Sequence, residues 1–168
     1  MSLEAIRRSF GKAGLVEPVL TDGRLVASDD SQMTLFTADG LLCAQEGLAA
    51  GDLEAVNGSV WTSYQSWLQT QGVHTHLHRD GSWLSAEEVL RSRRAPGNTC
   101  WSALGLGRPG TGDEPVNTSK GCGGVMRVAP VGLVPACLDV RQAFELGART
   151  AALTHGHPAG YHSAGALA

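Results

Sequence analysis

Apolar positions along much of this chain recur with the period of an α-helix. Over residues 33–48 they fall mostly three and four residues apart, and a second apolar stripe covers residues 53–68. This spacing places the apolar side chains on one face of each segment, as in helices that pack against a core. A third helix is predicted after Asp139, whose side chain can cap it, and residues 155–158 interrupt that helix.

Shorter helices are expected between these segments. Ser85 and Glu88 have the spacing of a capping box, which predicts a helix from Ser85 to about Arg94, and residues 98–104 can form another. Residues 105–124 are a long glycine-rich loop, and no stretch shows the alternation typical of a strand. The sequence therefore predicts an all-α fold. Small residues between Gly147 and Ala152 indicate close contact between helices.

Composition excludes several classes of protein. Thirteen Lys and Arg residues against sixteen Asp and Glu give a net charge of −3, which argues against bulk nucleic-acid binding. No apolar run approaches the ~20 residues of a membrane span, and the N-terminus lacks the apolar core of a secretory signal. The four cysteines are scattered without a CxxC pair, which is typical of reduced thiols. We therefore expect a cytoplasmic protein.

The first candidate for chemistry is the cluster Ser28, Asp29 and Asp30, directly before a predicted helix. Such a cluster is most often an N-cap, because its oxygens accept hydrogen bonds from free backbone N–H groups. One cap is sufficient for a helix, however, and here two carboxylates stand together with two hydroxyls, those of Ser28 and Ser31. Oxygen ligands of this kind suit Mg²⁺ or Mn²⁺, so the sequence leaves both interpretations open.

Two further clusters are candidates. Residues 117–127 are rich in glycine and can expose consecutive N–H groups to phosphate oxygens. They match neither the Walker nor the Rossmann motif. The alternative is an ordinary surface loop. His155 and His157, with His162, could bind zinc; a helix cap or a buried histidine is the favoured alternative. The histidines at 74, 76 and 78 are expected to be solvated.

Taken in order, four segments resemble the ADP-ribosylglycohydrolase family, which includes the dinitrogenase reductase-activating glycohydrolases. The segments are residues 28–42, 93–104, 117–133 and 153–168, and the resemblance extends from about Ser2 to Ala168. It implies an all-α domain with a two-magnesium centre in a cleft. It also implies hydrolysis of the bond that joins ADP-ribose to a protein side chain or another acceptor.

The resemblance also implies roles for particular residues. Ser28, Asp29 and Asp30 match the family's metal-ligand triplet, usually Thr-Asp-Asp, and the two aspartates are the implied catalytic residues. The implied substrate-binding residues are Gly97, Asn98 and Thr99 near the ribose and phosphates, Ser119, Gly121, Cys122 and Gly123 around the diphosphate and distal ribose, and His155 beside the substrate. The implied mechanism uses the metal ions, Mg²⁺ or Mn²⁺, to orient the ribose and a water while an oxocarbenium-like state forms.

Two family elements have no counterpart in this sequence. Family members open with a Gly-Asp-Ala-x-Gly motif, and a later Asp-x-Asp-Thr element supplies the other metal ligands. We therefore expect residues 1–168 to form a partial domain, the N-terminal and central half, with an incomplete metal centre. Activity would then need self-association or a complementing chain. The alternative is a non-catalytic remnant that binds ADP-ribose or is purely structural. The substrate class is an ADP-ribosylated protein or small molecule, and the sequence does not specify the acceptor.

Overall fold

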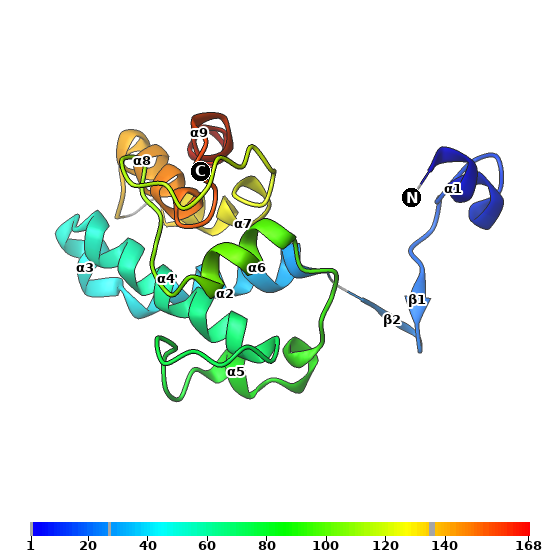
Figure 1. Cartoon of the computed structure of the whole chain (residues 1–168), viewed down its shortest axis with the longest axis horizontal. Helices are drawn as coiled ribbons and strands as arrows, with labels where there is room; N and C mark the ends of the chain where they lie inside the picture. Colours follow the sequence, from blue (N-terminus) through cyan, green and yellow to red (C-terminus); the bar gives the residue numbers. More distant parts are fainter. Residues whose placement is uncertain (1, 27, 135–136) are drawn as a thin grey trace.

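The computed structural model describes residues 2–26, 28–134 and 137–168 (Figure 1). The elements are, in chain order, α1 (Leu3–Phe10), β1 (Leu20–Thr21), β2 (Arg24–Leu25), α2 (Asp29–Cys43), α3 (Gln45–Ala50), α4 (Leu53–Thr70), α5 (Trp83–Ala86), the 3₁₀ helix η1 (Glu88–Arg91), α6 (Asn98–Gly105), α7 (Val125–Val128), the 3₁₀ helix η2 (Ala129–Leu133), α8 (Val140–Ala152) and α9 (Pro158–Leu167). The prediction of an all-α fold is confirmed. The two strands of two residues each form an antiparallel hairpin that is too short to produce an alternating pattern in the sequence.

The core lies between α2 and α4; α8 packs against α4, and α9 packs against α8 and α7 (Figure 1). Phe36, Tyr64 and Trp67 are fully buried there. The two central helices cross closely at Gly40, where an added Cβ would lie 2.6 Å from the Cα of Val60. A glycine at the crossing therefore sets the distance between the two longest apolar faces.

The contact between α8 and α9 uses small residues, as the sequence predicted. A Cβ at Gly147 would lie 2.6 Å from the Cβ of Ala168, and one at Gly165 would lie 2.6 Å from the carbonyl oxygen of Phe144. Asp139 caps α8 in a full capping box with Gln142. Asp52 likewise caps α4, where its Oδ1 accepts a hydrogen bond from the backbone N–H of Ala55 at 3.0 Å.

The helix predicted from Ser85 to Arg94 is wrong in its bounds and its cap. The chain forms two short elements instead, α5 and η1, separated at Glu87, and Ser85 lies inside α5 with a buried hydroxyl that has no hydrogen-bond partner. Leu84 and Leu90 are both buried. They would lie about 120° apart around a continuous helix, so the break lets both side chains reach the core.

The N-terminal arm, residues 2–26, stands apart from the helical body (Figure 1). None of the residues of α1 is buried. The arm joins the body just before α2, which begins at Asp29. None of the helices in the described part of the chain is long and apolar enough to cross a membrane.

Candidate functional site

The carboxylates at the start of α2 bind other groups rather than cap the helix. Asp29 Oδ2 accepts a hydrogen bond from the backbone N–H of Gly97 at 3.0 Å, and the Asp29 N–H donates to the carbonyl of Arg94 at 3.0 Å. Ser28 occupies the N-cap position without a capping hydrogen bond, and its hydroxyl donates to Asp30 Oδ2 at 2.5 Å. The interpretation of these side chains as helix caps is therefore wrong. Asp29 joins α2 to the segment before α6, whereas Ser28 and Asp30 bond to each other.

The same carboxylates are the candidate metal ligands. Asp29 is buried with 6% of its surface exposed, whereas Asp30 is exposed. Within residues 2–26, 28–134 and 137–168, no group of three or more His, Cys, Asp and Glu side chains could hold a metal ion. Mg²⁺ is commonly bound by only one or two carboxylates, with waters and substrate oxygens completing its shell. Two adjacent aspartates beside a hydroxyl fit that kind of site.

The glycine-rich loop is anchored on both sides. Asn117 Oδ1 accepts hydrogen bonds from the N–H groups of Ser119 at 2.9 Å and Gly156 at 3.2 Å, and its Nδ2 donates to the Thr154 carbonyl at 2.8 Å. The Ser119 hydroxyl lies 3.2 Å from the hydroxyl of Thr99, at the start of α6. These bonds hold the loop between α6 and the turn that joins α8 to α9.

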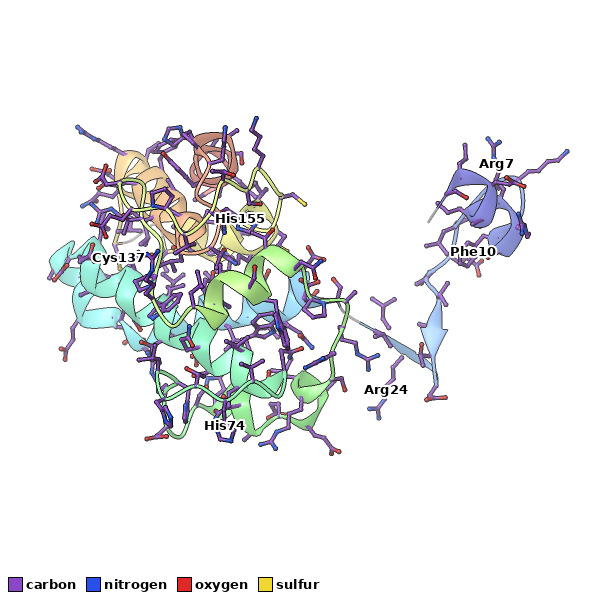
Figure 2. All side chains as sticks on the ribbon, in the orientation of Figure 1. Arg7, Phe10, Arg24, His74, Cys137 and His155 are labelled. Carbon is purple, nitrogen blue, oxygen red and sulfur yellow. The ribbon has the colours of Figure 1, made fainter. Side chains whose placement is uncertain are left out.

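His155 lies in that turn, beneath the loop. Only 1% of its surface is exposed, and Figure 2 shows it within the helical body. A Cβ at Gly121 would lie 3.3 Å from its Nε2, and one at Gly123 would lie 2.7 Å from its Cε1. The absence of a side chain at position 123 therefore allows the backbone of the loop to rest on the imidazole. An alanine there requires the ring or the loop to move.

A buried guanidinium lies behind this histidine. Arg127, in α7, is fully buried and donates hydrogen bonds to the Thr154 hydroxyl at 2.7 Å and the Thr150 carbonyl at 3.2 Å. Its guanidinium carbon lies 4.4 Å from the ring centroid of Tyr64, a cation–π contact. Among the described residues, no carboxylate forms a salt bridge with it. The positive charge is thus held by neutral groups alone.

Burial controls the protonation of the groups around Arg127. It lowers the pKa of His155 to about 4, and the neighbouring Arg127 charge acts in the same direction. Burial raises the pKa of the Cys100 thiol, against the opposing effect of Arg127, which donates to its sulfur at 3.3 Å. At neutral pH the imidazole is therefore neutral and the thiol protonated. Neither group is arranged to act as an ion.

The structure brings most of the predicted site residues together. Asp29 contacts Gly97, Thr99 contacts Ser119, and the glycines of the loop contact His155. Cys100, in α6, also lies against the loop, because a Cβ at Gly123 would lie 3.1 Å from its sulfur. The side chains of two predicted residues, Asn98 and Cys122, are exposed and make no hydrogen bond within the described ranges.

Sequence reasoning missed three residues that hold the site. Asn117, Arg127 and Thr154 all stand in the segments that carry the resemblance, but they were not assigned roles. The sequence around Arg127 could have indicated its role, because a lone arginine within the apolar run 125–131 is expected to be buried and to need hydrogen-bond partners. Asn117 and Thr154 carried no comparable signal, since their roles depend on contacts between distant segments.

The three histidines considered for zinc do not assemble. His157 caps α9, where its Nδ1 accepts a hydrogen bond from the N–H of Ala159 at 3.0 Å, and His162 packs edge-on against Tyr161 at 4.6 Å between ring centroids. His74 and His76 are exposed, as predicted. The prediction is wrong for His78, which is half-buried; its Nδ1 lies 2.7 Å from the Thr75 carbonyl and its Nε2 lies 3.1 Å from Asp80.

A cavity of about 410 Å³ lies away from these residues. It is lined by α4, α8 and the loop at 109–113, with Trp61 and Arg149 among its walls. None of the site residues described above lines it. The candidate site is therefore defined by three contacts, Asp29 with Gly97, Thr99 with Ser119, and the glycine loop with His155, and not by this cavity.

Comparison with known proteins adds one match. A family model described as ADP-ribosylglycohydrolase matches residues 1–168. Neither a curated protein nor a solved structure matches the chain. The all-α fold is consistent with this family. The chain belongs to the ADP-ribosylglycohydrolase family, and membership indicates hydrolysis of the ADP-ribosylglycohydrolase type.

Proposed function

We propose that this chain contributes the site of a Mg²⁺-dependent hydrolase that cleaves the glycosidic bond between ADP-ribose and an acceptor. One observation carries the proposal. In a chain that the family model matches throughout, contacts join segments that are far apart in the sequence: Asp29 with Gly97, Thr99 with Ser119, and the glycine loop with His155. The acceptor is an ADP-ribosylated protein or a small molecule.

Asp29 and Asp30 would hold the metal ion, with the Ser28 hydroxyl beside them. Mg²⁺ fits this set of oxygen donors, and Mn²⁺ would be accepted by the same set. When bound, such an ion orients a water and the substrate ribose and stabilises charge as the anomeric bond breaks. The hydrogen bond from the Gly97 N–H to Asp29 Oδ2 fixes the orientation of the carboxylate, which would favour binding of the ion.

The glycine loop would bind the diphosphate. Cys122 is exposed, so its N–H group can approach a phosphate oxygen. The Gly121 N–H donates to the Ser119 hydroxyl at 3.2 Å, and Asn117 accepts from the Ser119 N–H, so these bonds hold the loop in place. Orienting a substrate in this way lowers the entropic part of the barrier. His155, neutral and buried beside the loop, would donate to the substrate without adding a charge.

The experiment is a release assay with ADP-ribosylated protein, with and without Mg²⁺, using the unmodified chain and two variants. Asp29→Asn and Asp30→Asn keep the size of each side chain but remove its charge. Asp113→Asn is the control, because Asp113 is an exposed acid outside the site. We expect Mg²⁺-dependent release in the unmodified chain and the control, and loss of it in both site variants. Equal release in all four proteins would contradict the proposal.

A second function is favoured by the absence of a third acidic or histidine ligand near Asp29 and Asp30 in the described part of the chain. Under this alternative the chain binds ADP-ribose without hydrolysing it, or becomes active only with a second copy or a complementing chain. Binding without release at every protein concentration supports a binding module. Release whose specific rate rises with protein concentration supports self-association.

A further inference from the structure

Three buried side chains form a continuous hydrogen-bonded series that ends at the glycine loop. Arg127 Nη2 donates to Thr154 Oγ1 at 2.7 Å, and Thr154 Oγ1 lies 2.9 Å from Nδ1 of His155. All three side chains are essentially inaccessible to solvent, with exposed fractions of 0%, 0% and 1%. The hydrogen bonds inside the series therefore cannot be exchanged for bonds to water.

The direction of each bond follows from the donors available. A guanidinium only donates, so the threonine oxygen accepts from Arg127 and keeps one hydroxyl proton of its own. Buried polar hydrogens are nearly always paired, and His155 Nδ1 is the nitrogen acceptor within reach. The Cys100 sulfur also lies near this hydroxyl, but a thiol is a weak acceptor. The arrangement that pairs both the Thr154 hydroxyl proton and His155 Nδ1 has the Thr154 hydroxyl donating to His155 Nδ1.

A neutral imidazole that accepts at Nδ1 must carry its proton on Nε2. That nitrogen faces the loop, since added Cβ atoms at Gly121 and Gly123 would lie 3.3 Å and 2.9 Å from it. No described residue forms a hydrogen bond with Nε2. The ring therefore presents one free donor, and that donor faces the glycine loop.

We propose that Arg127 and Thr154 are positioning residues that fix His155 as the Nε2–H tautomer, so that Nε2–H donates to an acceptor oxygen of bound ADP-ribose. This inference rests on the proposed function for its ligand. It assigns Arg127 a second role besides packing, because the guanidinium orients the threonine proton. It also accounts for a buried cation that has no carboxylate partner among the described residues.

The first test is long-range ¹⁵N–¹H correlation of the histidine rings in the ligand-free chain. We expect the proton on Nε2 and the Nδ1 signal of a hydrogen-bond acceptor. Thr154→Val removes the hydroxyl at nearly constant volume and should move the Nδ1 signal, whereas Thr154→Ser keeps the hydroxyl and should restore it. His74→Gln, at an exposed histidine, should leave the His155 signals unchanged. A proton on Nδ1, or no change in Thr154→Val, would overturn the inference.

The second test is ADP-ribose affinity of the same proteins, with folding checked by circular dichroism. Thr154→Val should weaken binding by roughly tenfold, the cost of one misdirected hydrogen bond, and Thr154→Ser should recover most of it. Equal affinity in the two variants would overturn the positioning role. If the unmodified chain gives the expected ring signals but does not bind ADP-ribose, the hydrogen-bonded series is established. That result would overturn the assignment of ADP-ribose as the ligand, and with it the proposed function.

Discussion

Replacing Gly123 by alanine tests the contact between the glycine loop and His155. The added Cβ would lie 2.7 Å from Cε1 and 2.9 Å from Nε2 of the buried ring, and 3.1 Å from the sulfur of Cys100. Side-chain carbons rarely approach atoms so closely, and neither neighbour is the free end of a flexible chain. Overpacking of this kind typically costs about 1–3 kcal/mol, which corresponds to a fall of about 3–9 °C in Tm for a domain of this size.

The matched control is Gly58→Ala, because Gly58 is exposed within α4 and an added Cβ meets nothing within 4 Å. That change should raise stability by about 0.5–1 kcal/mol, since alanine is the better helix former. Denaturant titrations of both variants measure the difference, and ADP-ribose titration reports whether the loop has moved. A Gly123→Ala variant as stable as Gly58→Ala would refute the close packing of loop and ring.

Three further predictions follow from the buried groups. The pKa of His155 is about 4 in the folded chain and 6.5 in the unfolded one, so the folded state binds fewer protons between these pH values. The free energy of unfolding should therefore fall by about 2–3 kcal/mol as the pH drops through this window. In denaturant titrations, His155→Gln should lack that dependence. Asp39→Asn should cost about 1–3 kcal/mol, measured in the same way, since the buried carboxylate loses the charge that faces Arg79 Nη1 at 3.8 Å, even though the amide oxygen can still accept from Ser63. Gly40→Ala should lower Tm measurably in a thermal melt, because its Cβ would lie 2.6 Å from the backbone of Val60.

The larger features of the fold were readable from the sequence. The apolar stripe over residues 53–68 gave α4, and Asp139 marked the start of α8 correctly, because both signals depend only on local spacing and capping. The split between α5 and η1 was not readable. A capping-box pattern at Ser85 competed there with the need to bury both Leu84 and Leu90, and burial prevailed.

The candidate site was readable only in part. The aspartates at 29 and 30 attracted attention as a cluster, but the partner of Asp29 is the Gly97 N–H, 68 positions further along the chain, and local spacing carries no information about it. Thr154 is a similar case. Its hydroxyl matters because α7 places Arg127 against it. Contacts between segments decide the geometry of the site, and a single sequence does not record them.

The most direct test of the account is a calorimetric titration of ADP-ribose into this chain, with and without Mg²⁺. The account predicts binding that strengthens with Mg²⁺ and loses that dependence in Asp29→Asn, because the carboxylates at the start of α2 would hold the ion against the ligand. ADP-ribose binding of equal strength in both conditions would favour the non-catalytic alternative. No binding in either condition would contradict the central claim that Asp29, the glycine loop and His155 form an ADP-ribose site.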